Sequence, residues 1–286
     1  MHGTDSGTPN PDLVERSAGL STGVTVRYVE QGARDGTPVI FLHGVTDSWW
    51  SFEPVLRHLP VEIRAFAVSQ RGHGDSDRPP RGYAFSDLAA DLHAFMDVVD
   101  LPSAVLVGHS MGALVAQRFA VDHPKRVDGL VLTGAFPTLY RHAAIREFVA
   151  TVVSRLRDPV DPAMVREFQA STLARPVPSE FLERVVSESL KVPARVWNAT
   201  FEAFLTTPDF SRELAAVGAP ALIVWGDRDG YAVRADQEAL LAAIPGARLL
   251  TYEGGGHAVH WEEPVRFAHD VARFVLARRP AGTPRR

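Results

Sequence analysis

The chain of 286 residues contains no cysteine. This absence excludes disulfide bonds, thiolate metal sites and a cysteine nucleophile. Long apolar runs are missing too, since none approaches the roughly 20 residues that a membrane-spanning helix requires. The first residues, Met1 to Pro11, are polar and lack the basic and apolar segments of a secretory signal. We therefore expect a cytoplasmic protein with no membrane partner.

An excess of positive charge is absent as well. The 30 lysine and arginine residues are outnumbered by 34 aspartate and glutamate residues, and the resulting formal net charge of −4 argues against nucleic acid as a partner. The length permits one large domain or one domain with an insertion. No pattern in the chain indicates a bound metal or a cofactor, and we expect a monomer or homodimer that acts on a small molecule.

Strand-like and helix-like segments alternate through most of the chain. An alternation of apolar and polar residues over 23–31 predicts a half-exposed edge strand, whereas the continuous apolar run 38–42 predicts a central strand buried on both faces. The alternation of strands with helices predicts a parallel α/β sheet. The remaining strand-like segments are 63–68, 104–107, 127–132, 219–225 and 248–252, and the helix-like ones are 86–99, 111–122, 235–244 and 262–278.

This alternation of strands and helices stops between residues 137 and 217, where only helical periodicity is present. Asp161 and Pro162 have the pattern of an N-cap followed by a first-turn proline, which predicts the start of a helix. We expect the block to be a helical insertion at the carboxyl edge of the sheet. The predicted organisation is a disordered arm over 1–12, a core over 13–136 and 218–278, a helical cap over 137–217 and a disordered tail over 279–286.

The segment Val105–Gly112, Val-Leu-Val-Gly-His-Ser-Met-Gly, passes from a strand-like run into a helix-like one. It has the G-x-S-x-G pattern of a nucleophile elbow, in which the serine lies at the tip of a sharp turn. A side chain at Gly108 or Gly112 would collide with the neighbouring strand and helix. The turn exposes the hydroxyl and directs the first amides of the helix at the group that it attacks. We therefore predict that Ser110 is a nucleophile.

A serine hydroxyl needs a base to remove its proton, and the base needs a third group that holds its tautomer. Asp227 and Asp229 follow one later strand, and His257 and His260 follow the next. The chain order Ser, Asp, His, with each residue in a loop after a strand, predicts a catalytic triad. The pattern alone leaves both aspartates and both histidines open.

The chain resembles the α/β-hydrolase fold family, in the branch with a helical cap between the sixth and seventh core strands. The resemblance covers about residues 22–278. It implies a mostly parallel sheet of about eight strands, flanked by helices and carrying the inserted cap. The segments that carry it are His43-Gly44, Gly72-His-Gly-Asp-Ser76, Gly108-His-Ser-Met-Gly112, and Gly226-x-x-Asp229 with Gly256-His257.

The resemblance also implies individual roles. The acid of the family lies three residues after the loop glycine, which selects Asp229, and the base follows the glycine run, which selects His257. The backbone N–H groups of Val45 and Met111 form the oxyanion hole by the same resemblance. Loss of one such donor typically lowers the rate by about 10²–10³.

Other residues near these segments have simpler interpretations. We expect His109 to pack beside the elbow and His43 to brace the loop of the oxyanion hole. His260, together with Glu262 and Glu263, indicates a hydrated cluster at a helix start rather than a metal site. Six aromatic residues are candidates for the substrate pocket, although their spacing fits core packing equally well. They are Trp49, Trp50, Phe136, Tyr140, Trp197 and Phe201.

Together these features predict a cofactor-independent serine hydrolase that cleaves a small, largely apolar carboxylic ester or lactone through an acyl-enzyme on Ser110. Haloalkane dehalogenases and epoxide hydrolases of the family carry aspartate at this position, and serine is instead suited to attack on a carbonyl carbon.

Three alternatives stay open. One is a perhydrolase, or non-haem haloperoxidase, in which peroxide replaces water at the acyl-enzyme. Another is a C–C bond hydrolase, which the segment His43-Gly-Val-Thr-Asp47 disfavours because the oxyanion loop of such enzymes is usually richer in glycine. The last is a small-molecule receptor that retains the triad, an interpretation that rests on the fold alone.

Overall fold

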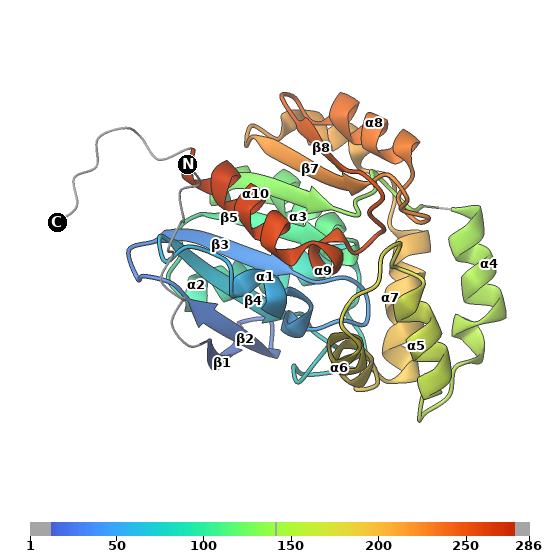
Figure 1. Ribbon diagram of the computed structural model, residues 1–286. Coiled ribbons are helices and arrows are strands. Elements are labelled where there is room, and N and C mark those ends of the chain that lie inside the picture. Colours follow the sequence, from blue (N-terminus) through green and yellow to red (C-terminus); the bar gives the residue numbers. More distant parts are fainter. Residues whose placement is uncertain (1–12, 141, 278–286) are drawn as a thin grey trace.

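The structure is a computed structural model that describes residues 13–140 and 142–277 (Figure 1). The predicted arm over 1–12 and the predicted tail over 279–286 lie outside the described residues. Within the described residues, no helix combines the length and the apolar character needed to cross a membrane.

Eight strands form a single sheet in the order β1-β2-β4-β3-β5-β6-β7-β8. β1 pairs with β2 and β2 with β4 in antiparallel fashion, and every further pair is parallel. The predicted mostly parallel sheet is therefore confirmed. The strands are β1 Val14–Gly19, β2 Thr25–Gln31, β3 Thr37–Leu42, β4 Ile63–Ser69, β5 Ala104–His109, β6 Val127–Thr133, β7 Ala221–Gly226 and β8 Arg248–Tyr252.

The prediction that residues 23–31 form the edge of the sheet is wrong. β2 lies between β1 and β4, so the edge at this end is β1. Every residue of β1 except Ala18 is exposed. A strand with one buried position has no alternation of apolar and polar residues, so no periodic pattern in the sequence predicts β1.

Helices cover both faces of the sheet (Figure 1). Successive side chains of β3 point to opposite faces: Ile40 and Leu42 pack with residues of α2 and α3, whereas Val39 and Phe41 pack with residues of α1 and α10. The predicted burial of this strand on both faces is confirmed. The helices outside the inserted segment are η1 Trp49–Phe52, α1 Glu53–Leu56, α2 Phe85–Val98, α3 Met111–Asp122, η2 Pro124–Arg126, α8 Arg234–Ala243, α9 Val259–Glu262 and α10 Pro264–Leu276.

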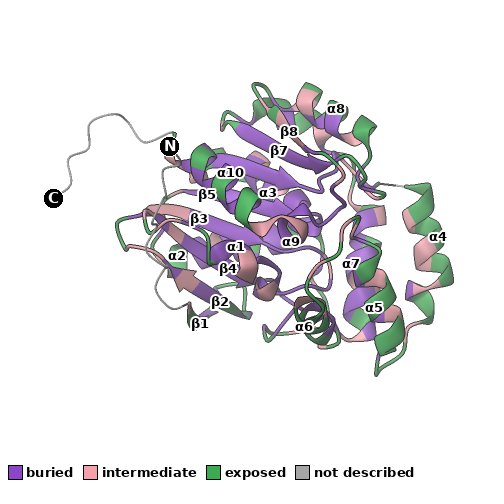
Figure 2. Cartoon of the chain, in the orientation of Figure 1, coloured by how far each residue is buried: buried purple, intermediate pink, exposed green. Residues whose placement is uncertain are grey.

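Between β6 and β7 the chain forms four α-helices, called here the inserted helices. Asp161 caps the second of them, because its side chain accepts a hydrogen bond of 2.9 Å from the amide of Ala163. The group lies beside the ends of the parallel strands, and its outer surface is largely exposed (Figures 1 and 2). The segment comprises α4 Ala143–Thr151, η3 Val153–Arg155, α5 Pro162–Ala170, α6 Ser179–Ser189, α7 Ala194–Thr206 and η4 Ser211–Ala216.

Candidate active site

Ser110 lies at the turn between β5 and α3 with φ 51° and ψ −110°, a conformation that residues other than glycine rarely adopt. The two flanking glycines make this turn possible. A Cβ atom on Gly112 would lie 2.0 Å from the carbonyl oxygen of Leu42, and one on Gly108 would lie 2.4 Å from the carbonyl oxygen of Gly112. The strand and helix therefore approach too closely for any other residue, as the elbow pattern predicts.

His257 and Asp229 are in direct contact. The Nδ1 atom of His257 lies 2.8 Å from Oδ2 of Asp229, and the two side chains are 5% and 0% exposed. The other carboxylate oxygen accepts hydrogen bonds of 2.8 and 2.9 Å from the amides of Tyr231 and Ala232. An ionised carboxylate can only accept, so the shared proton belongs to Nδ1. In a neutral ring with this tautomer, Nε2 carries the lone pair.

The second aspartate and the second histidine make other contacts. Asp227 accepts a hydrogen bond of 2.5 Å from the amide of Gly254 and so holds the glycine-rich loop. His260 lies 3.1 Å from the hydroxyl of Ser51 and is fully buried. Asp229 and His257 thus contact each other, whereas Asp227 and His260 have other partners.

The prediction of a hydrated cluster around His260 is wrong. Burial lowers the pKa of its imidazole well below the ordinary value, and the proximity of His257 adds to this effect. Glu262 is also engaged, because its carboxylate accepts hydrogen bonds from the amides of Ala174 and Gly256. Within residues 13–140 and 142–277, no group of three histidine, aspartate or glutamate side chains could hold a metal ion.

Val45 lines the same cavity as Ser110, and Met111 directly follows Ser110 in the chain. Met111 is the first residue of α3, where an N–H group has no acceptor within the helix. In the part of the chain that the structure describes, neither the N–H group of Val45 nor that of Met111 donates a hydrogen bond to another backbone or side-chain atom. Both donors are therefore available to a ligand, as an oxyanion hole requires.

Ser110 and His257 open onto a cavity of about 210 Å³. Core residues that line it include Phe136, Tyr231 and Trp261. The inserted segment provides much of the remaining wall. Its apolar lining residues are Ala144, Ile145, Phe148, Phe168, Phe201 and Phe204, and its polar ones are His142, Gln169 and Thr172.

Of the six aromatic residues predicted to line the pocket, the structure places Phe136 and Phe201 on its wall. Trp197 is fully buried behind Phe201, with ring centroids 6.0 Å apart. Trp49 and Trp50 stack on each other at 4.6 Å and belong to the core on the α1 and α10 face. Tyr140, like these three tryptophans, is not among the described lining residues. The prediction that these four residues line the substrate pocket is therefore not supported by the described cavity.

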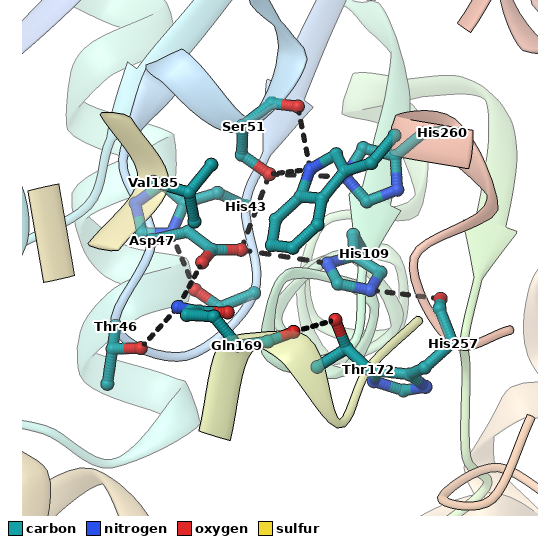
Figure 3. Close-up of polar contacts among 12 residues, drawn as sticks. His43, Thr46, Asp47, Ser51, His109, Gln169, Thr172, Val185, His257 and His260 are labelled. Atoms are coloured by element: carbon teal, nitrogen blue, oxygen red, sulfur yellow. Dashed lines mark hydrogen bonds and ion pairs between the residues drawn. The ribbon is translucent and has the colours of Figure 1, made fainter. Parts of the chain in front are cut away.

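A polar cluster that sequence reasoning missed surrounds the carboxylate of Asp47 (Figure 3). The side chain is 3% exposed and lines the cavity. Its oxygens accept hydrogen bonds of 3.0 Å from Gln169 and 3.3 Å from Ser51. Burial raises the pKa of this carboxyl to about 7, against the lowering effect of both hydrogen bonds and of the nearby His257.

His109 connects this cluster to His257. Its Nε2 atom lies 3.2 Å from the carbonyl oxygen of His257, and its Nδ1 atom lies 3.9 Å from Oδ2 of Asp47 (Figure 3). Burial, together with the neighbouring His260 and His257, lowers the pKa of His109 well below its ordinary value. A neutral ring that donates from Nε2 leaves Nδ1 as an acceptor, and among the described residues Nδ1 has no hydrogen-bond partner.

His43 holds the loop that carries Val45. Its Nδ1 atom lies 2.7 Å from the carbonyl oxygen of Gly44, and its Nε2 atom accepts a hydrogen bond of 3.0 Å from the amide of Gln70. His43 thus braces this loop, and His109 lies at the end of β5 directly before Ser110.

Comparisons with known proteins agree with this fold. A family model described as alpha/beta hydrolase fold matches residues 37–264. The chain is 30% identical over 256 residues to the AB hydrolase superfamily protein YisY of Bacillus subtilis, covering 84% of this chain and 91% of that protein. It is also 30% identical over 273 residues to a non-heme chloroperoxidase of Streptomyces lividans, covering 89% and 97% of the two chains. The crystal structure of the esterase RhEst1 from Rhodococcus sp. ECU1013 is similar with a TM-score of 0.80 at 28% identity, covering 92% and 98%.

Proposed function

Because this chain belongs to the α/β-hydrolase fold family, we propose that it is a serine hydrolase that cleaves a small, largely apolar carboxylic ester or lactone. The observation that carries the proposal is the contact of 2.8 Å between Asp229 and His257, made beside a cavity into which Ser110 opens. The similarity to an esterase structure at 28% identity supports the same reaction class.

In the proposed reaction, Nε2 of His257 removes the proton of the Ser110 hydroxyl as the oxygen attacks the substrate carbonyl carbon. The carbonyl π electrons move to the oxygen, and the backbone N–H groups of Val45 and Met111 stabilise the resulting oxyanion. Asp229 stays ionised and stabilises the imidazolium that forms.

The tetrahedral intermediate then collapses. The bond to the alcohol breaks, and the alcohol leaves with the proton from His257, so the acyl group remains on Ser110. Water enters, gives its proton to His257 and attacks the acyl carbon. A second collapse returns the proton to Ser110 and releases the carboxylic acid.

The cavity supports the proposed substrate class. A volume of about 210 Å³ with a largely apolar wall suits a compact acyl or aryl group. The described residues that line it include no lysine or arginine, which favours an uncharged substrate over a polyanionic one.

A second candidate reaction is perhydrolysis, which the 30% identity to a non-heme chloroperoxidase favours. Hydrogen peroxide would replace water at the acyl-enzyme, and the product would be a peracid in place of the acid. Adding peroxide to an ester assay and measuring peracid distinguishes the two outcomes.

The direct test measures turnover of nitrophenyl esters of increasing acyl length, and of one aryl lactone, by the wild type and by Ser110→Ala. We expect the wild type to hydrolyse short or aromatic acyl esters and the variant to be inactive while keeping its fold. Turnover by Ser110→Ala at the wild-type rate would refute the proposal.

A further inference from the structure

Residues at and just after the end of α5 contact two loops of the candidate site, the loop that carries Val45 and the loop that carries His257. The side-chain amide nitrogen of Gln169 lies 3.1 Å from the hydroxyl of Thr46 and 3.0 Å from the carboxylate of Asp47 (Figure 3). Three residues later, the carbonyl oxygen of Thr172 accepts a hydrogen bond of 2.8 Å from the amide of His257. One turn of the inserted segment thus holds the loop of the oxyanion hole and the loop of the base together.

The loop that Gln169 contacts is strained. Thr46 has φ 67° and is fully buried. A β-branched residue rarely adopts this left-handed conformation, because its side chain crowds the backbone. Such a conformation persists only where the surroundings determine it, and it is found at sites where geometry matters for function. Thr46 directly follows Val45, whose N–H is a proposed oxyanion donor.

The side chain of Gln169 is placed to hold Thr46 in this conformation. Its side chain is 1% exposed, and its amide nitrogen also lies 2.7 Å from the hydroxyl of Ser189 on α6. Two inserted helices therefore hold the carboxamide in place. On the core side, Ser51 holds the other carboxylate oxygen of Asp47. Gln169 and Ser51 therefore hold Asp47 from both sides, and Asp47 directly follows the strained Thr46.

We propose that Gln169 is a positioning residue for the oxyanion hole, which acts from the inserted helices by holding Thr46 in its strained conformation and so placing the Val45 N–H. This inference rests on the proposed serine mechanism and assigns to the inserted helices a part in catalysis beyond that of a pocket wall. The consequence is kinetic: loss of the contact should weaken the binding of the transition state more than that of the substrate.

The test uses Gln169→Met, which keeps the length of the side chain and removes the donor. Gln31→Met is the matched control, because Gln31 is also a buried glutamine and its amide donates only to Leu56, in the described residues, away from the cavity. Gln169→Asn, with a carboxamide one methylene shorter, serves if the methionine variant fails to fold. Thermal unfolding establishes that each variant is folded.

Three quantities are measured with a nitrophenyl ester: kcat, KM and the inhibition constant of an alkyl trifluoromethyl ketone. The ketone is a probe of the hole, because Ser110 adds to its carbonyl carbon, the π electrons form an oxyanion and the serine proton passes to His257. We expect kcat of Gln169→Met to fall about 10- to 100-fold, since a displacement of about 1 Å in a catalytic group can cost 10²-fold. The inhibition constant should rise in parallel, KM should change by less than about threefold, and Gln31→Met should match the wild type.

A second variant tests the strain directly. Asparagine tolerates the left-handed conformation better than threonine, so adding Thr46→Asn to Gln169→Met should restore part of the lost kcat. No restoration would show that Gln169 does not act through this backbone and would overturn the proposal.

Unchanged kcat and ketone inhibition in Gln169→Met would overturn the proposal, as would a rise in KM at constant kcat, which would make Gln169 a substrate contact. Ser110→Ala is assayed in parallel. If it retains full turnover, the serine mechanism itself is refuted, whereas an inactive Ser110→Ala beside a fully active Gln169→Met refutes only the positioning by Gln169.

Discussion

The carboxylate of Asp229 holds the ring of His257 with one oxygen, at 2.8 Å, and two backbone amides with the other. Three hydrogen bonds thus determine the position of a carboxylate that is itself fully buried. An acid held in this way keeps the imidazole of the base in one tautomer and one orientation.

Asp229→Asn should therefore lower kcat by about 10⁴ and leave the fold intact, because an amide cannot stabilise the imidazolium and favours the wrong tautomer. Asp227→Asn is the control, since that side chain holds only the loop at Gly254 among the described residues. Steady-state kinetics of both variants check the prediction. A larger loss of kcat in Asp227→Asn than in Asp229→Asn would reverse the assignment.

Asp47→Asn should change the dependence of stability on pH. The folded pKa of about 7 lies above the ordinary value of 3.8 because the carboxyl is buried. Between these values the unfolded chain releases a proton that the folded chain keeps, so the contribution of Asp47 to the free energy of unfolding falls as pH rises, and it is constant above about pH 7.

The Asp47→Asn variant has no carboxyl at this position, so its free energy of unfolding does not fall with pH for this reason. Relative to the wild type, it should gain about 2 to 3 kcal/mol in free energy of unfolding between pH 5 and pH 8, as two units of pKa imply. Its amide can also donate to the unpartnered Nδ1 of His109. Urea unfolding at both pH values measures the effect, and a difference between the two proteins that is independent of pH would contradict it.

Gly112→Ala should destabilise the protein by at least about 3 kcal/mol, because the added methyl group would meet the carbonyl oxygen of Leu42 at 2.0 Å. Gly218→Ala is the matched control, since a Cβ atom there meets no atom within 4 Å. That variant should stay within about 0.5 kcal/mol of the wild type. Chemical unfolding compares them, and equal stabilities would show that the elbow does not need its glycine.

Phe148→Ala should enlarge the cavity from the side of the inserted helices. Phe148 lines the cavity and is only half-buried, so we expect the truncation to favour a longer acyl chain over a short one by about tenfold in kcat/KM. Trp50→Leu should leave this ratio unchanged, because Trp50 packs on Trp49 and against Arg184. The nitrophenyl ester series measures both ratios. An effect of Trp50→Leu equal to that of Phe148→Ala would place the pocket elsewhere.

Local patterns predicted much of the fold. The apolar run that became β3 and the glycines around Ser110 are signals that lie within a few residues of one another. β1 gave no signal because its pairing with β2, rather than a buried face, makes it a strand. The helical periodicity between residues 137 and 217 predicts the inserted helices.

The walls of the site were harder to foresee. Trp197 and Phe201 lie four residues apart on one stripe of α7, yet Phe201 lines the cavity and Trp197 packs behind it. Periodicity indicates that a side chain is buried and not what it is buried against. The contact of Gln169 with Asp47 joins residues 122 positions apart. No local sequence pattern at either residue predicts this contact.

The central claim is that Ser110 is the nucleophile, and a fluorophosphonate reagent tests it most directly. The serine oxygen attacks phosphorus, fluoride leaves and the serine proton passes to His257, so a stable adduct forms. Peptide mass spectrometry of the treated protein should find one adduct per chain, on Ser110, with esterase activity lost in proportion, while Ser110→Ala is neither labelled nor active. An adduct on another residue with Ser110 unmodified, or full ester hydrolysis by Ser110→Ala, would contradict the account.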